Sequence, residues 1–172
     1  ATAEVFDDGG FFHTGDLARF DGQKNMTVCG RKKALIVNRE GKNIYPEEVE
    51  QVIERCPFVR DVIVLGYHVG DESGERVGAI VVPNDDAVTE WHKGVPLSGA
   101  ATDTFLREEV IERCRSQVAD YKMPRKIVIR HEPLERTSTM KIRRVVYAGT
   151  LDEREASGSA VLADIEFGDG QM

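Results

Sequence analysis

Two short runs of branched apolar residues, at positions 59–66 and 77–83, constrain the fold more than any other feature of the chain. Val and Ile dominate both runs, and apolar runs of this length and composition are typical of buried β-strands. The segment between the two runs is rich in Gly, Asp and Glu, which favours a turn. We therefore expect two buried strands joined by a turn.

A helix is expected immediately before this pair of strands. Proline suits the first position of a helix, and Pro46 is followed by two acidic residues that would face the positive end of the helix dipole. The helix should end near Cys56, because Pro57 disfavours helical geometry in the residue before it. Its apolar face would consist of Val49, Val52 and Ile53.

A second helix is expected after the strands. It would run from Asp103, the expected N-cap, to Val118, with an apolar residue at every fourth position. A short helix and a loop are expected over residues 84–102, and another strand over residues 126–130. Short strands at 17–20 and 26–29, separated by Asp21-Gly22, predict a hairpin near the start of the chain. With a further short strand at 34–37, the order predicts an α+β fold in which helices pack on a small mixed sheet.

Composition and charge exclude several classes of protein. The 172 residues include 23 basic and 30 acidic ones, for a net charge of −7, so general nucleic-acid binding is not expected. No stretch approaches the roughly 20 apolar residues of a membrane-spanning helix, and we expect a cytoplasmic protein. The three cysteines are far apart and form no CxxC pair, and the four histidines show no ligand spacing. We therefore expect reduced thiols and no metal site.

The charge is unevenly distributed. Residues 122–144 are strongly basic and could contact a phosphate or another anion, whereas residues 151–172 form an acidic tail. Composition alone favours the alternative, a solvated basic surface that binds nothing. Within the tail, residues 161–167 could add a strand or be loosely ordered.

Four segments carry residue types that suit chemistry, although each is ordinary when taken alone. A carboxylate at a turn can accept hydrogen bonds from a sugar diol. Three cations after a glycine suit the binding of an anion or a mobile joint between domains. A lysine in a loop can neutralise negative charge that develops on a phosphate. The segments are Phe12-His13-Thr14-Gly15-Asp16-Leu17, Gly30-Arg31-Lys32-Lys33, Gly41-Lys42-Asn43-Ile44-Tyr45-Pro46-Glu47-Glu48 and Thr137-Ser138-Thr139-Met140-Lys141-Ile142-Arg143-Arg144.

In their order and spacing these segments resemble the C-terminal part of the adenylate-forming superfamily of acyl- and aryl-CoA synthetases, peptide-synthetase adenylation domains and luciferases. The resemblance covers about residues 10–147, and the third segment looks most like a long-chain fatty acid CoA ligase. It implies two half-reactions. A carboxylate attacks the α-phosphate of ATP to give an acyl-adenylate and pyrophosphate, and the thiol of CoA then displaces AMP to give a thioester.

The resemblance also implies roles for five residues. Asp16 matches the aspartate that holds the ribose hydroxyls, and Arg31 matches an arginine that reaches the nucleotide. Lys33 falls at the hinge between the large and small domains, and Gly41 matches a loop glycine beside the path of the CoA pantetheine. Lys141 matches the catalytic lysine that bridges the carboxylate and the phosphate during adenylation.

Two departures from the family are visible. Met140 occupies the position before the lysine where the family usually has glycine, and methionine would be strained there if the loop needs a positive φ. The Ser/Thr/Gly-rich phosphate loop of the large N-terminal domain is also absent from the sequence. We therefore expect a fragment, inactive alone, in which residues 1–32 are a hairpin remnant of the AMP-binding domain, 33–150 are the mobile C-terminal domain and 151–172 are the tail.

The resemblance implies the chain's own N-terminal AMP-binding domain as its partner and a fatty acid or another carboxylate as substrate. It implies ATP and CoA as cosubstrates, with Mg²⁺ arriving with ATP and bound mainly by that other domain. Peripheral association of the parent protein with a membrane is compatible with it. An aryl-CoA ligase and a fatty acyl-AMP ligase are alternatives within the family. A stand-alone module that docks an anionic partner, such as a carrier protein, is an alternative of another class.

Overall fold

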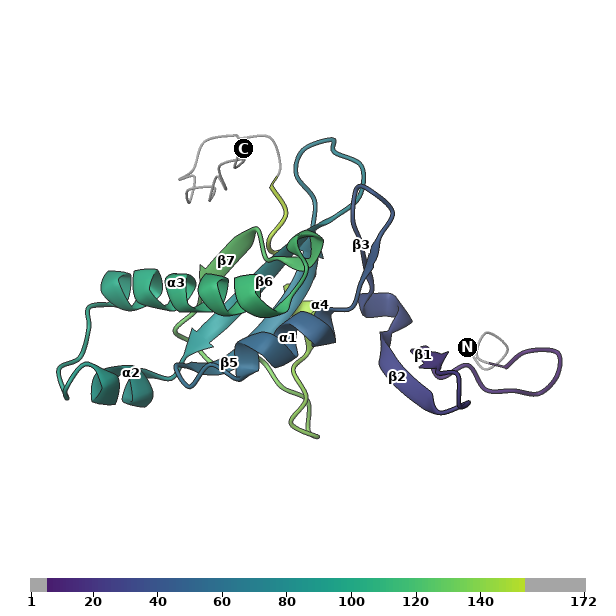
Figure 1. The fold of residues 1–172 in the computed structure, drawn as a ribbon, viewed down its shortest axis with the longest axis horizontal. Helices are drawn as coiled ribbons and strands as arrows, with labels where there is room; N and C mark the ends of the chain where they lie inside the picture. Colours follow the sequence, from purple (N-terminus) through teal and green to yellow (C-terminus); the bar gives the residue numbers. More distant parts are fainter. Residues whose placement is uncertain (1–5, 154–172) are drawn as a thin grey trace.

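The computed structural model describes residues 6–153, which form a small mixed sheet with helices packed on it and two separate two-stranded ribbons (Figure 1). This arrangement confirms the expected α+β fold, and the hairpin precedes the sheet as predicted. The elements in chain order are β1 (Asp16–Phe20), β2 (Met26–Arg31), the 3₁₀ turn η2 (Lys32–Ala34), β3 (Ile36–Val37), β4 (Asn43–Ile44), α1 (Pro46–Glu54), β5 (Val59–Tyr67), β6 (Arg76–Pro83), α2 (Asp85–Trp91), α3 (Gly99–Gln117), the 3₁₀ turn η3 (Asp120–Lys122), β7 (Lys126–Ile129) and α4 (Arg144–Tyr147).

The two apolar runs form the centre of the fold, as the sequence predicts. Strands β5 and β6 pair antiparallel, with Ile63 opposite Ile80, and β7 then joins the other edge of β6 in parallel. A parallel neighbour needs a long crossover, which α2 and α3 supply between β6 and β7.

Both faces of this sheet are buried, because successive residues of a strand point to opposite sides. Helices α1 and α3 cover one face, where Val62 and Val64 of β5 meet Val49 of α1 and Leu106 of α3. The segment after β7, which includes α4, covers the other face. The second cluster consists of Ile63, Tyr67, Ile80, Val82, Leu134, Tyr147 and Leu151.

Helix α1 begins at Pro46 as predicted and ends at Glu54, slightly before the expected limit at Cys56. Its apolar face is buried against β5, and full burial of one aliphatic side chain contributes about 1.5–3 kcal/mol. Cys56 and Cys114 lie in the same core, where both free thiols pack among apolar side chains.

The start of helix α3 differs from the prediction. The helix begins at Gly99 rather than after Asp103, because the Ser98 side chain accepts a hydrogen bond from the backbone N–H of Ala101 and caps the helix one turn earlier. Asp103 instead lies within the helix and contacts Nε2 of His131 at 2.9 Å. The short helix α4 was not predicted, and residues 161–167 of the tail lie outside the described part of the chain.

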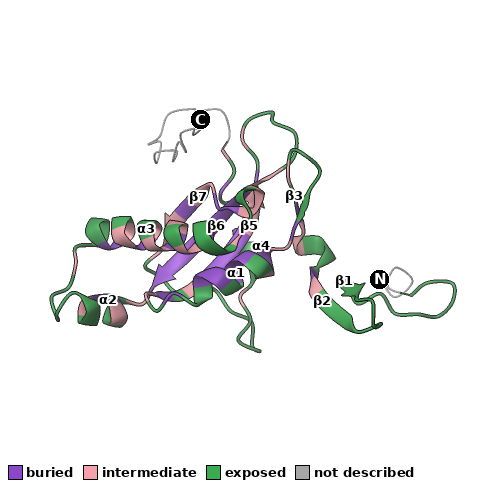
Figure 2. Ribbon diagram, viewed as in Figure 1, coloured by how far each residue is buried: buried purple, intermediate pink, exposed green. Residues whose placement is uncertain are grey.

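The β1–β2 hairpin forms as predicted but contributes almost nothing to the core (Figure 2). Large apolar side chains on it face solvent, including Phe20 at 69% exposure and Val28 at 60%. A lone two-stranded hairpin is marginally stable in water, so these strands need a neighbour to cover them.

Candidate functional site

A wide cleft of about 1470 Å³ separates the base of the hairpin from the three-stranded sheet. Asp16, Arg31 and Lys33, three of the five predicted site residues, line it together. The sheet side supplies Gly66, His68 and Glu75, and the segment around α4 supplies Arg144, Val145, Gly149 and Asp152.

Asp16 and Arg31 form an ion pair at the mouth of this cleft. They lie opposite each other in the register of β1 and β2, and Nε of Arg31 is 2.7 Å from Oδ1 of Asp16. Arg31 also donates to the carbonyl of Thr14 at 3.0 Å, which fixes the guanidinium beside the turn before β1. The side chain of Asp16 is one-third exposed, so a ligand in the cleft can reach it.

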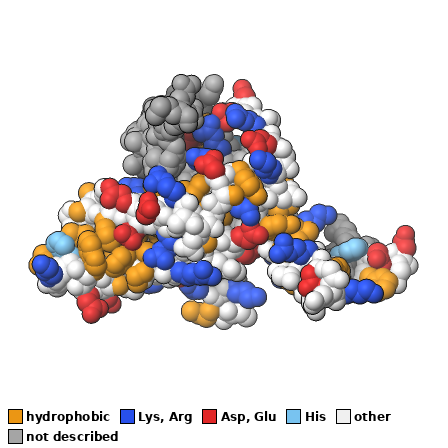
Figure 3. Space-filling model, in the orientation of Figure 1, with side chains coloured by type: hydrophobic (Ala, Val, Ile, Leu, Met, Phe, Trp, Pro, Cys, Tyr) orange, Lys and Arg blue, Asp and Glu red, His pale blue; other side chains and the backbone are white. Residues whose placement is uncertain are grey.

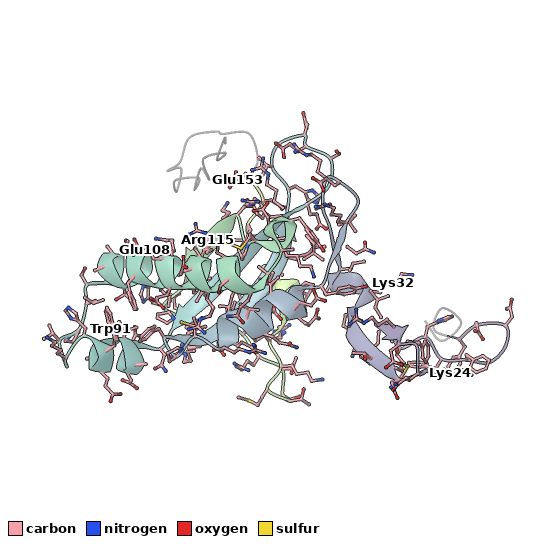
Figure 4. All side chains as sticks on the ribbon, viewed as in Figure 1. Lys24, Lys32, Trp91, Glu108, Arg115 and Glu153 are labelled. Carbon is pink, nitrogen blue, oxygen red and sulfur yellow. The ribbon has the colours of Figure 1, made fainter. Side chains whose placement is uncertain are left out.

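Lys33 lies in η2, the short 3₁₀ turn that links the hairpin to the rest of the protein, where Figure 4 labels its neighbour Lys32. Just before this turn, Gly30 is buried against Tyr45 and Glu47, and a Cβ at Gly30 would lie 2.8 Å from Oε2 of Glu47. The connection is thus short and closely packed at one point. Sequence reasoning gave Gly30 no role of its own.

Gly41 lies in a different loop, which joins β3 to β4. Its φ is +74°, a conformation that glycine adopts without strain. Apart from its two chain neighbours, no atom of residues 6–153 would lie within 4 Å of a Cβ at this position. Asn38 stabilises the loop because its Oδ1 accepts hydrogen bonds from the backbone N–H groups of Glu40 and Lys42. Gly41 lines neither the cleft nor the pocket beside Lys141.

Lys141 follows a tight turn that projects from the sheet. The backbone N–H of Met140 donates to Thr137 O at 2.9 Å, and that of Thr137 donates to Lys141 O at 2.8 Å. Met140 has a φ of +63°, so the position that the family usually gives to glycine does require the left-handed conformation. Methionine is strained there by about 1 kcal/mol.

The ammonium group of Lys141 is exposed and forms no ion pair with any residue from 6 to 153. By contrast, every other Lys and Arg of the basic segment forms an ion pair with an acidic side chain of this chain. Lys and Arg side chains gather around the projecting turn (Figure 3). The pairs are Lys122–Glu48, Arg125–Asp120, Lys126–Glu153, Arg130–Glu132, Arg136–Asp61, Arg143–Glu135 and Arg144–Glu50. Lys141 is therefore the cation of this segment that is available to an anion.

A buried ion pair holds the base of this turn. Glu50 of α1 is 8% exposed and contacts a guanidinium nitrogen of Arg144, and it accepts a hydrogen bond from the backbone N–H of Val64 at 2.7 Å. Arg144 also donates to Val64 O at 2.9 Å. Burial is the main reason why the pKa of Glu50 lies above its ordinary value, with Arg144 opposing the shift.

A second ion pair holds the turn from its other end, between Arg136 and Asp61 of β5. Arg136 also donates to Met140 O at 2.6 Å. A pocket of about 550 Å³ lies between these two pairs, with Lys141 at its rim. The sequence analysis gave Glu50 no role. Its position beside the apolar face of α1 was a signal, because a carboxylate buried there needs a charged or hydrogen-bonding partner.

The structure thus divides the predicted residues into three places. Asp16, Arg31 and Lys33 line the cleft, Lys141 lines the smaller pocket, and Gly41 lies on a separate loop. Arg144 lines both hollows and connects them. Among residues 6–153, no three His, Cys, Asp or Glu side chains lie close enough to hold a metal ion. Every helix in the same range is too short or too polar to span a bilayer.

Comparison with known proteins finds a matching family model and several similar ligases. The family model described as the AMP-binding enzyme C-terminal domain matches residues 48–141. The long-chain-fatty-acid–CoA ligase FadD13 of Mycobacterium tuberculosis is 33% identical over 147 residues, which are 85% of this chain and 25% of that protein. The indoleacetate–CoA ligase of Aromatoleum aromaticum is 35% identical over 144 residues, which are 84% of this chain and 24% of that protein. The chain therefore spans about a quarter of the length of the curated relatives that it matches.

Solved structures also match the fold of this chain. ATP-bound MatB from Rhodopseudomonas palustris matches with a TM-score of 0.62 and 31% identity, over 84% of this chain and 25% of MatB. The o-succinylbenzoate CoA synthetase MenE of Bacillus subtilis, solved with its acyl-adenylate intermediate, matches with a TM-score of 0.61 and 28% identity, over 83% of this chain and 25% of MenE.

Proposed function

Because this chain belongs to the family of AMP-binding enzyme C-terminal domains, we propose that it is the mobile lid of an ATP-dependent acid–CoA ligase. The observation that carries this proposal is the Asp16–Arg31 pair, which faces the cleft directly before the short link at Lys33. The pair offers an acceptor for a diol and a cation for a phosphate at one point. The names of the relatives, which are acyl- and aryl-CoA ligases, support the reaction class.

In the proposed reaction a carboxylic acid attacks the α-phosphate of ATP and releases pyrophosphate, and the CoA thiol then attacks the acyl carbon and releases AMP. Asp16 would accept hydrogen bonds from the ribose hydroxyls, and Arg31 would contact the nucleotide. Lys141 would stabilise the negative charge that develops on the reacting carboxylate and phosphate, because its ammonium group is exposed and unpaired among residues 6–153. Gly41 would leave room for the pantetheine arm of CoA.

We propose that the chain divides into three parts and that the lid turns relative to the large domain between the two half-reactions. Residues 1–32 would belong to the large AMP-binding domain, residues 33–150 would form the lid, and residues 151–172 would be an acidic tail. The solvent-exposed apolar face of the β1–β2 hairpin supports the first boundary, because such strands require a neighbouring sheet. Lys33 would be the hinge about which the lid turns.

The residues present fit ATP in part. Asp16 and Arg31 suit the ribose and a phosphate, whereas the described residues offer no carboxylate cluster for Mg²⁺. We therefore propose that Mg²⁺ would come with the phosphates of ATP and be held mainly by the large domain. The chain alone is expected to be inactive, since Asp16 and Arg31 provide only one wall of the nucleotide site.

Two classes of carboxylic acid are candidates for the acyl substrate. A long-chain fatty acid is favoured by the resemblance to FadD13, whereas the similarly close indoleacetate–CoA ligase favours an aryl acid. ATP–pyrophosphate exchange with a panel of carboxylic acids decides between them. The chain joined to its large domain should exchange only with the acids that it activates, and the chain alone should not exchange with any acid. Exchange by the isolated chain would contradict the proposed role of a lid.

A further inference from the structure

Hydrogen bonds to Asn38 shape the loop that carries Gly41, but the two strands that it joins are very short. Strands β3 and β4 pair through only two residue pairs, Ile36 with Ile44 and Val37 with Asn43. A ribbon this short is marginally stable by itself. Contacts with the rest of the protein must therefore help to fix the position of Gly41, and Ile36 and Ile44 supply some of them because both are buried in the core.

The end of the loop that joins β5 to β6 supplies this support. The backbone N–H of Glu75 donates to Val37 O at 2.9 Å, and Oε2 of Glu75 accepts from Val37 N–H at 3.1 Å. Glu75 thus satisfies both outward-facing backbone groups of Val37 and takes the place of a third strand at the open edge of the ribbon. Figure 1 shows the two loops side by side above the sheet.

Two glycines make this contact possible. A Cβ at Gly66 would lie 2.4 Å from Oε1 of Glu75, so the carboxylate occupies space that only glycine leaves open. A Cβ at Gly74 would lie 2.6 Å from the backbone nitrogen of Arg39, and Gly74 has a φ of +81°. The backbone of the β5–β6 loop therefore packs directly on the backbone of the Gly41 loop.

We propose that Glu75 and Gly74 are positioning residues for thioester formation: they hold the Gly41 loop in the place where the pantetheine arm of CoA must pass. This inference rests on the proposed function, because it assigns the Gly41 loop to CoA. A displacement of about 1 Å at a substrate-guiding segment can cost orders of magnitude in rate, so a fixed loop matters to the second half-reaction. The first half-reaction does not depend on this loop.

The contact is tested first in this chain by hydrogen exchange. Replacing Glu75 with Ala removes the acceptor for Val37 N–H, and amide exchange at Val37, Gly41 and Lys42 should accelerate about tenfold. Glu75→Gln keeps an acceptor oxygen and should stay within about threefold of the wild type. Glu72→Ala is the matched control, because Glu72 lies in the same loop and pairs with Arg76. Equal acceleration in Glu72→Ala would contradict the contact.

The role in catalysis is tested in the complete ligase. Glu75→Ala should raise the KM for CoA about tenfold and should lower ATP–pyrophosphate exchange much less, although Glu75 also lines the cleft. Glu75→Gln should restore the wild-type KM. Gly74→Ala should give the same split with a larger effect, since it pushes the backbone of Arg39 away.

The possible failures are distinct. A wild-type ligase that shows no acid-dependent exchange would refute the proposed function and this inference with it. An active wild type whose KM for CoA is unchanged by Glu75→Ala would refute only the positioning role. Equal losses in both half-reactions would also refute it, because they indicate a general structural defect.

Discussion

The turn around Lys141 and the loop around Gly41 are held by different forces. Two ion pairs, Arg136–Asp61 and Arg144–Glu50, anchor the Lys141 turn to β5 and α1, and the carboxylate of the second pair is buried. The Gly41 loop has its own Asn38 hydrogen bonds and the contact with Glu75.

This difference suits the two proposed tasks. A lysine that stabilises a developing charge must be fixed in position, since electrostatic stabilisation works through preorganised groups. Rigid anchoring by charged side chains achieves this and leaves the Lys141 ammonium group unpaired among the described residues. A loop that lets a long flexible arm pass needs backbone shape and no charge, which glycines and hydrogen bonds provide.

The largest expected effect comes from breaking the buried anchor of the Lys141 turn. Glu50→Ala leaves Arg144 partly buried without its carboxylate and should destabilise the protein by about 3 kcal/mol. Urea unfolding of this chain measures the loss. Glu54→Ala, one turn later on the exposed side of α1, is the control and should change stability by less than about 0.5 kcal/mol. A similar loss in both variants would mean that the ion pair has no special role.

A stiffened hinge at Lys33 should affect the step assigned to the Gly41 loop more than the step assigned to Lys141. Proline fixes φ near the value of a 3₁₀ turn, so Lys33→Pro is compatible with η2 and restricts the motion of the link. In the complete ligase this variant should slow thioester formation about tenfold relative to adenylation, measured by single-turnover kinetics of each step. Equal rates for both steps would place the hinge elsewhere.

The pH dependence of stability tests the burial of Glu50. Its pKa is raised above 4.5 chiefly by burial and also by Glu47, so the folded state binds more protons than the unfolded state just above pH 4.5. The contribution of Glu50 to stability should therefore fall as the pH rises from 4.5 through the raised pKa. The stability of the wild type minus that of Glu50→Gln should decline over this range. A rise would show that attraction to Arg144 outweighs burial.

The smallest expected effect concerns Met140. Glycine accepts the φ of +63° without strain, so Met140→Gly should stabilise the folded protein by up to about 1 kcal/mol, reduced by the greater freedom of glycine in the unfolded chain. Thermal unfolding measures the change. Ser138→Gly in the same turn is the control and should be destabilising, because Ser138 has no positive φ to relieve.

Local sequence signals predicted the central elements well. The branched runs became β5 and β6, Pro46 began α1, and Asp21-Gly22 turned the first hairpin, because each signal acts within a few residues. The start of α3 was wrong by about one turn, because the cap at Ser98 was overlooked in a polar stretch. The conditional prediction that Met140 would be strained is confirmed by its φ.

Contacts between distant segments could not be predicted in the same way. Glu50 and Arg144 are 94 positions apart, and nothing in their local sequence pairs them. The approach of Gly74 to Arg39 likewise depends on how two loops pack, which a single sequence does not encode locally. The assigned roles of Asp16, Arg31, Lys33, Gly41 and Lys141 depend on the family resemblance, and they stay predictions until measured.

The most direct test of the account is to measure both half-reactions in the complete ligase with Lys141→Ala. Adenylation, followed by ATP–pyrophosphate exchange, should fall by about a hundredfold to a thousandfold, because an isolated positive charge at the reacting phosphate is lost. Thioester formation from preformed acyl-adenylate and CoA should stay within about threefold of the wild type, since that step would use the Gly41 loop. Equal losses in the two half-reactions would contradict the division of labour between the two regions.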